Sequence, residues 1–234
     1  MKKFVGVQVA IVVITLVIGM VNKSTFKNAG ILDVKNASDV DALNCNISEM
    51  FTDDMYDYWS SNEFQTDKIT FCKEAKNVVI VEPLDEIECY GMSMLQKVKI
   101  KKVIKGDIEL DATIWISKSG GPSKEKINLY KYDNEDPIYI LNFADIMRTG
   151  NEYIAMLDEK QSISDYIDRE IYYGADDMFT YFALNNENKA ISKNVCDVKL
   201  AELKNCDIFA QSEETLACIE QIKTEVLSYY NVED

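Results

Sequence analysis

The chain of 234 residues contains no histidine. This absence excludes Ser-His-Asp and Cys-His nucleophilic catalysis, histidine-ligated zinc and haem, and the usual pH switch near neutrality. No two of the six cysteines are spaced C-x-x-C, so the signal of a redox motif or a zinc knuckle is also missing. The sequence therefore indicates no catalytic, cofactor-binding or metal-ligating residue, and no cofactor.

Positive charge is scarce as well. The chain has 25 lysines and arginines against 40 aspartates and glutamates, which gives a formal net charge of -15. A field of this sign repels the phosphates of nucleic acids, so we predict that the protein does not bind nucleic acid. Apolar residues make up 47% of the chain, which is enough for most of it to bury a core.

One long uncharged run lies near the N-terminus. Phe4 to Val21 are 18 residues without a charge, and Lys2 and Lys3 precede them. As a helix the run would span about 27 Å, close to the hydrocarbon core of a bilayer. The lysines should stay in the cytoplasm, which places the rest of the chain outside. We predict a single-pass protein of the cell membrane, and the alternative is secretion after cleavage of a signal peptide.

This run divides the chain into three parts. Residues 1–22 are predicted to form the transmembrane anchor or signal, and through it the membrane contact. Residues 23–41 are polar and are predicted to form a stalk. Residues 42–234 are predicted to form one extracytoplasmic domain, whose barrel core lies near residues 69–185.

All six cysteines follow the apolar run, on the side predicted to be outside. An even number of cysteines in an oxidising compartment is typical of a disulfide set, and buried free thiols are the alternative. The sequence does not choose a pairing. The candidate disulfide cysteines are Cys45, Cys72, Cys89, Cys196, Cys206 and Cys218.

The middle of the chain has the pattern of β-strands. Residues 77–82 form an apolar run that ends at Pro83, as a mostly buried strand would. Residues 94–104 alternate between apolar and polar until Lys101-Lys102 breaks the alternation, which predicts a β-bulge. Further strands are expected at 112–117, 152–157 and 179–184, and a strand or short helix is expected at 138–143.

The C-terminal part has the pattern of an amphipathic helix over residues 212–230. Ser212 can cap its N-terminus, and apolar residues then recur at helical spacing. This stripe is predicted to face the core.

The strand segments also carry a family resemblance. The runs Val78–Glu82, Val98–Asp107 and Glu152–Leu157 resemble a group of largely uncharacterised exported bacterial proteins with a netrin/TIMP-like OB-type barrel. The resemblance implies an OB-like barrel over roughly residues 77–160. Together with the helix and the apolar run described above, it gives the predicted α+β fold: a small OB-like antiparallel β-barrel with flanking helices, a C-terminal amphipathic helix and an N-terminal transmembrane helix. TIMP proteins inhibit metalloproteases through an N-terminal cysteine, and Cys45, the first cysteine here, does not match that position.

Acidic and basic groups supply the remaining candidates. Close carboxylates could bind calcium, although solvated loops are the simpler interpretation. A row of lysines could contact an acidic partner, or it could be a solvated strand face that protects a sheet edge. The carboxylates are Asp53, Asp54, Asp57, Asp133, Glu135, Asp136, Asp176 and Asp177, and the lysines are Lys97, Lys99, Lys101, Lys102 and Lys105.

We therefore predict a membrane-tethered extracytoplasmic binding or interaction module for an unknown protein or polymer partner, without evident catalytic chemistry. The alternative is an exported hydrolase that uses carboxylates, with or without calcium, on an extracellular polymer. The alternative requires a cleft that brings at least two of these acids together.

Overall fold

The computed structural model describes residues 34–43, 46–47, 50–90, 93–123, 138–141, 145–161, 169–185, 187–204 and 206–232. The predicted anchor or signal, residues 1–22, lies outside this part of the chain. Within the described part, no helix is both long and apolar enough to span a bilayer.

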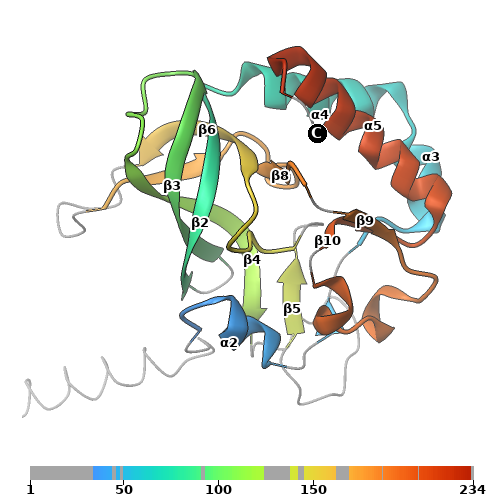
Figure 1. Cartoon of the computed structure of the whole chain (residues 1–234). Coiled ribbons are helices and arrows are strands. Elements are labelled where there is room, and N and C mark those ends of the chain that lie inside the picture. The colour runs from blue at the N-terminus through green and yellow to red at the C-terminus, as the bar shows by residue number, and fades with distance from the viewer. Residues whose placement is uncertain are drawn as a thin grey trace, which may run out of the picture. The chain divides into compact units, whose positions relative to one another are not determined.

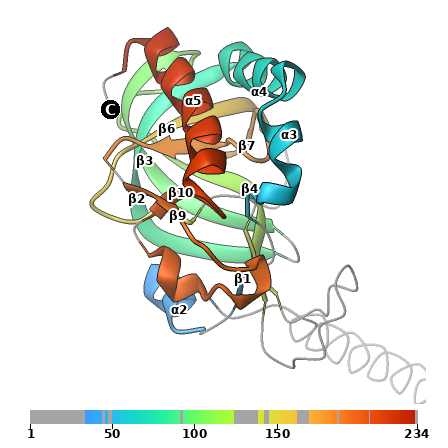
Figure 2. The ribbon, with the colours of Figure 1, turned by 90° about the vertical axis from the view of Figure 1, so that its right-hand side faces the viewer.

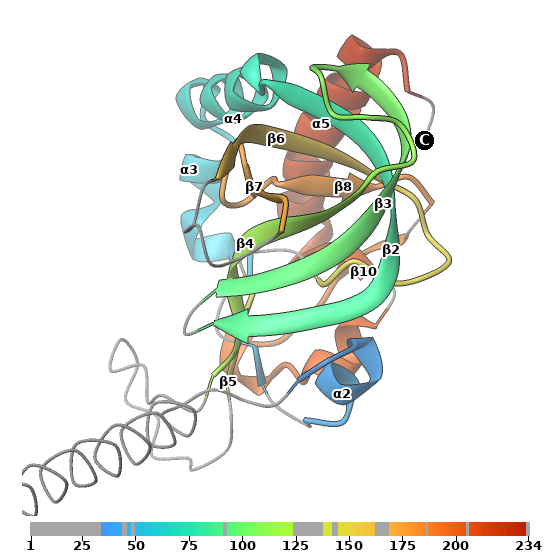
Figure 3. The same cartoon turned by 90° about the vertical axis from the view of Figure 1, so that its left-hand side faces the viewer.

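Five strands close into a barrel (Figure 3). They follow one another in the order β4-β3-β2-β6-β7, and β7 returns to pair with β4. Every neighbouring pair is antiparallel except β4 and β7, which run parallel. The barrel confirms the predicted α+β class. Its strands are β2 (Asn77–Tyr90), β3 (Ser93–Lys105), β4 (Thr113–Ser123), β6 (Tyr153–Gln161) and β7 (Ile171–Gly174).

The remaining strands lie outside this ring. β8 pairs with β6. β5 pairs with the last residues of β4 on one side and with β1 on the other. β9 and β10 form a separate parallel pair. Two of the predicted segments, at 138–143 and 179–184, thus correspond to β5 and β8 rather than to barrel strands. The bounds are β1 (Asn46–Ile47), β5 (Ile138–Leu141), β8 (Tyr181–Ala183), β9 (Glu187–Ala190) and β10 (Cys206–Ala210).

The apolar run of β2 is buried on both faces. Val79 and Val81 point into the barrel core, whereas Val78 and Ile80 pack under the helices. The predicted bulge is confirmed in the neighbouring strand. Ile80 pairs with Lys102 and the next residue pairs with Ile100, which leaves Lys101 as the extra residue.

Three helices pack side by side against one face of the barrel (Figures 1 and 2). The C-terminal helix begins after Ser212, whose hydroxyl accepts a hydrogen bond from the Thr215 N–H at 3.2 Å. Its predicted apolar stripe is buried in the core that these helices share with the barrel. The helices are α3 (Tyr56–Trp59), α4 (Asn62–Glu74) and α5 (Glu213–Tyr230), with the short 3-10 helices η1 (Asp53–Met55), η2 (Val195–Asp197) and η3 (Leu200–Leu203) beside the irregular segments.

The last residues of the predicted stalk belong to the folded unit. Helix α2 (Ala37–Asp41) packs near β2, and the side chains of Val34 and Val40 are buried. The Ile87 N–H donates to the Lys35 carbonyl at 2.8 Å. Folded structure therefore starts at least eight residues before position 42, because two apolar side chains in this polar stretch find a place in the core.

The cysteines differ from the disulfide prediction. Cys72, Cys89 and Cys218 are free thiols, and Cys72, Cys89 and Cys206 are buried among apolar side chains. Burial raises the pKa of Cys72 to about 12 and that of Cys89 to about 11, so both stay protonated near neutrality. Cys45 and the side chain of Cys196 lie outside the described residues.

Candidate functional site

A groove of about 520 Å³ runs between α4 and α5. Helix α3 contributes its N-terminal residue, Tyr56, to the lining. Most of the side chains that line the groove are polar and uncharged, and the only charged ones are two glutamates. The lining consists of Tyr56, Ser60, Asn62, Gln65, Thr66, Ile69, Glu214, Ala217, Cys218, Gln221 and Glu225.

The two walls of the groove are joined by hydrogen bonds between the helices. Within the groove, the Gln65 amide donates to the Cys218 carbonyl at 3.1 Å. Beyond the residues that line it, the Tyr230 hydroxyl donates to the Cys72 carbonyl at 2.9 Å. Since Gln65 precedes Cys72 and Cys218 precedes Tyr230, α4 and α5 run in the same direction. The groove therefore lies between rigid elements and not between loops.

The protonation states of Tyr56 and Cys218 limit the chemistry that the groove can perform. Partial burial, and then the nearby Glu214 carboxylate, raise the pKa of the Tyr56 hydroxyl, which also hydrogen-bonds Glu214. Burial raises the pKa of Cys218 as well, so its thiol is not an activated nucleophile. Glu214 and Glu225 are eleven residues apart on one helix, about 16 Å at 1.5 Å per residue. The arrangement is suited to binding a ligand, because hydrogen-bond acceptors line the groove and the two carboxylates are far apart.

The surface around the groove is acidic and its carboxylates are not paired. Within the described residues, no salt bridge involves any of the eight acidic side chains of α3, α4 and α5. The lysines of these helices are engaged elsewhere: Lys68 pairs with Asp176 at 2.6 Å, Lys73 lies over the Tyr229 ring, and Lys223 is buried. The eight are Asp57, Glu63, Asp67, Glu74, Glu213, Glu214, Glu220 and Glu225.

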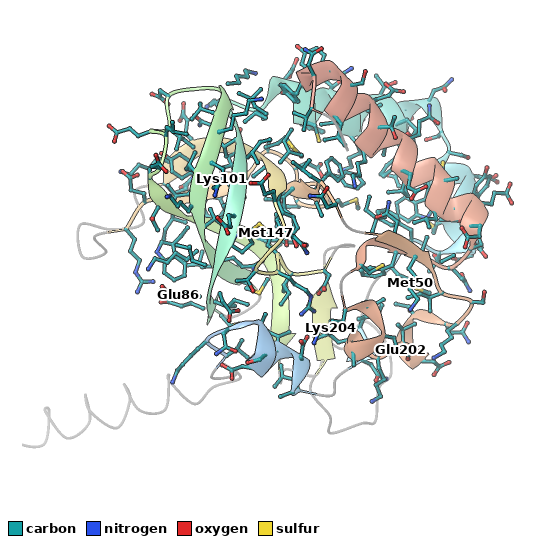
Figure 4. The ribbon with its side chains drawn as sticks, in the orientation of Figure 1. Met50, Glu86, Lys101, Met147, Glu202 and Lys204 are labelled. Atoms are coloured by element: carbon teal, nitrogen blue, oxygen red, sulfur yellow. The ribbon has the colours of Figure 1, made fainter. Side chains whose placement is uncertain are left out.

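In the predicted row of five lysines on the barrel, in contrast, three are paired with acidic side chains. Lys97 pairs with Glu86 at 2.8 Å, and Lys101 pairs with Glu82 at 3.0 Å. Figure 4 labels Glu86 and Lys101, one member of each pair. Lys99 pairs with an aspartate at 2.9 Å, the Lys105 ammonium donates to a main-chain carbonyl, and Lys102 is exposed. The structure thus favours the solvated strand face over a contact for an acidic partner.

The predicted carboxylate groups do not meet in the groove. Asp53 accepts hydrogen bonds from the hydroxyls of Ser212 and Thr215, so it supports the start of α5. Asp176 pairs with Lys68 and accepts two main-chain N–H groups, so it is structural. Asp54, Asp57 and Asp177 are exposed, and the Asp133, Glu135 and Asp136 cluster lies outside the described residues. Among described residues, no three acids or cysteines come close enough to hold a metal ion.

A buried charge cluster that the sequence did not reveal lies between α2 and the barrel. Arg148 Nε donates to Asp145 Oδ2 at 2.8 Å, and Arg148 Nη1 lies 3.1 Å from Asp41 Oδ1. The segment that carries Asp145 and Arg148 is held by Gln96, whose amide exchanges two hydrogen bonds with the main chain of Met147. No motif marks this cluster, because Asp41 and Gln96 are distant from Arg148 in the chain, although Asp145 lies only three residues before it. The cluster fastens the segment before the barrel to the barrel itself.

Asp145 should make stability depend on pH. Burial raises its pKa to about 6, although the charges of Arg148 and Lys118 act in the opposite direction. Its value in the unfolded chain is near 3.8, so the folded state binds more protons between those limits. Its contribution to the free energy of unfolding should therefore fall as pH rises from about 4 to 6, by as much as about 3 kcal/mol. Urea unfolding at several pH values tests this: the slope should flatten in Asp145→Asn, and equal slopes would contradict it.

Comparison with known proteins adds no relative: no protein-family model and no curated protein matches this chain.

Proposed function

We propose that the protein is a membrane-tethered extracytoplasmic interaction module on an OB-type barrel, and that it binds its partner in the α4–α5 groove. The observation that carries the proposal is the groove itself, which is polar, open and built between two hydrogen-bonded helices. The strand order of the five-stranded barrel, with its single parallel pair, supports the OB assignment. The uncharged run at 4–21 supports the tether.

The groove does not support the alternative of a carboxylate-dependent hydrolase. Glycoside hydrolysis needs two carboxyl groups roughly 5–9.5 Å apart. Glu214 and Glu225 stand about 16 Å apart along one helix, which is too far for a shared reaction centre. The residues of the groove therefore support a binding function better than a hydrolytic one.

Filling the groove should abolish partner binding. Ala217 lines the groove and is exposed, so Ala217→Trp should occupy it at little cost to folding. With the tagged full-length chain in detergent as bait, we expect partner recovery from envelope proteins of the source organism to fall at least ten-fold. Thr224→Trp is the matched control, because Thr224 is exposed on the same helix and does not line the groove.

Cys218 provides a second readout of the same event. Its thiol lines the groove and is partly exposed, whereas Cys72, Cys89 and Cys206 are buried. Reaction of Cys218 with a small thiol reagent should slow when a partner occupies the groove. Equal recovery by the two tryptophan variants, together with unchanged Cys218 labelling, would refute the proposed function.

A further inference from the structure

We propose that the α4–α5 groove binds a basic peptide segment in extended conformation, with two lysine or arginine side chains placed about four residues apart. This inference rests on the proposed function, which it narrows to one chemical class of partner. It follows from the distribution of charge, from the dimensions of the groove and from the kind of side chains on its walls.

The distribution of charge is uneven over the folded unit. On the barrel, the acids next to the lysine row are consumed in ion pairs, such as Glu82 with Lys101 and Glu86 with Lys97. On the helical layer, the eight carboxylates of α3, α4 and α5 have no cationic partner among the described residues. Unpaired negative charge on one face attracts a cationic partner and repels acidic ones.

The dimensions of the groove match a short peptide. Glu214 and Glu225 lie on the same face of α5, about 16 Å apart. In an extended chain, residues i and i+4 point to the same side and their Cα atoms are about 13 Å apart. The flexible side chains of two lysines can cover the remaining distance, so each ammonium group reaches one carboxylate.

The neutral lining suits the main chain of such a peptide. Ser60, Asn62, Thr66 and Gln221 offer donors and acceptors on the walls of the groove. An extended peptide exposes its own N–H and C=O groups and can hydrogen-bond to these side chains. The charged ends would then fix the position of the peptide, and the polar middle would hold its main chain.

Matched peptides test the inference directly. The full-length chain in uncharged detergent is titrated into fluorescein-labelled Lys-Ser-Ala-Ser-Lys or Glu-Ser-Ala-Ser-Glu, and fluorescence anisotropy is measured. We expect binding of the lysine peptide only, weakening steeply as salt rises from about 50 to 500 mM because the ionic contacts are screened. Glu214→Gln and Glu225→Gln should each weaken the lysine peptide about five-fold, the upper range for an exposed ion pair. Glu213→Gln removes the same charge from the neighbouring residue outside the groove and should change affinity less than two-fold.

The outcomes separate this inference from the proposed function. If Glu213→Gln and Glu214→Gln weaken the peptide equally, or if both peptides bind alike, the partner is not selected by the groove carboxylates and the inference is wrong. If neither peptide binds while Ala217→Trp still abolishes partner recovery, the groove is a binding site for another chemistry and only the inference is overturned. Thermal unfolding of each variant verifies that loss of binding is not loss of folding.

Discussion

Replacing Arg148 with methionine is expected to lower the free energy of unfolding by about 3–5 kcal/mol, as for other buried ion pairs that lose one partner. The substitution keeps much of the side-chain volume and leaves Asp145, almost fully buried, without its cation. It also removes the ion pair between Arg148 and Asp41, which links α2 to the segment next to the barrel. Urea denaturation followed by fluorescence measures the change.

Two further variants make this prediction specific. Lys204 also lies near Asp41, at 3.4 Å, but is mostly exposed, so Lys204→Met should cost less than about 1 kcal/mol. Combining Arg148→Met with Asp145→Asn removes the stranded charge and should recover part of the loss. A double variant that is less stable than Arg148→Met alone would show that burial of the unpaired carboxylate is not the cause.

Replacing Gly106 with alanine is expected to lower the free energy of unfolding by roughly 2–5 kcal/mol. Gly106 has a φ of +95°, and a Cβ atom there would lie 2.2 Å from Asn77 Oδ1 and 2.9 Å from the Lys76 carbonyl oxygen. The Asn77 side chain is fixed in place, because it accepts from the Asp107 N–H and donates to the Asp158 carbonyl. Steric overlap therefore adds to the strain of the left-handed backbone.

Gly150 offers a control that separates these two causes. It has a similar φ of +87°, but a Cβ atom there would meet nothing within 4 Å. Gly150→Ala should therefore cost only the conformational part, about 1–2 kcal/mol. If the two alanine variants unfold at the same urea concentration, the contact with Asn77 contributes nothing.

Local patterns predicted much of the fold. Two barrel strands were predicted, β2 from the apolar run before Pro83 and β3 from the alternation that starts at residue 94. The break at Lys101-Lys102 predicted the bulge in β3. The stripe after Ser212 identified α5. These features depend on residues that are close together in the chain, so the local pattern of the sequence is enough to predict them.

Features made by distant residues could not be predicted in this way. β7 has only four residues and no clear alternation, although it completes the barrel. Helix α4 has no clear sequence signal either, because its few buried side chains are scattered among polar residues. The groove and the Arg148 cluster depend on which elements pack together, and no spacing in the sequence encodes that.

The closing strand, β7, also affects how readily the chain aggregates. Without Ile171–Gly174, the strands β4, β3, β2 and β6 would form an open sheet, in which the edges of β4 at Trp115–Ser117 and of β6 at Leu157–Gln161 lack their pairing strand. Such edges are templates for pairing with other chains. β7 follows β4 by about fifty residues, so a nascent chain carries both edges exposed until this short segment has emerged. Four residues thus convert a sheet prone to aggregation into a closed one.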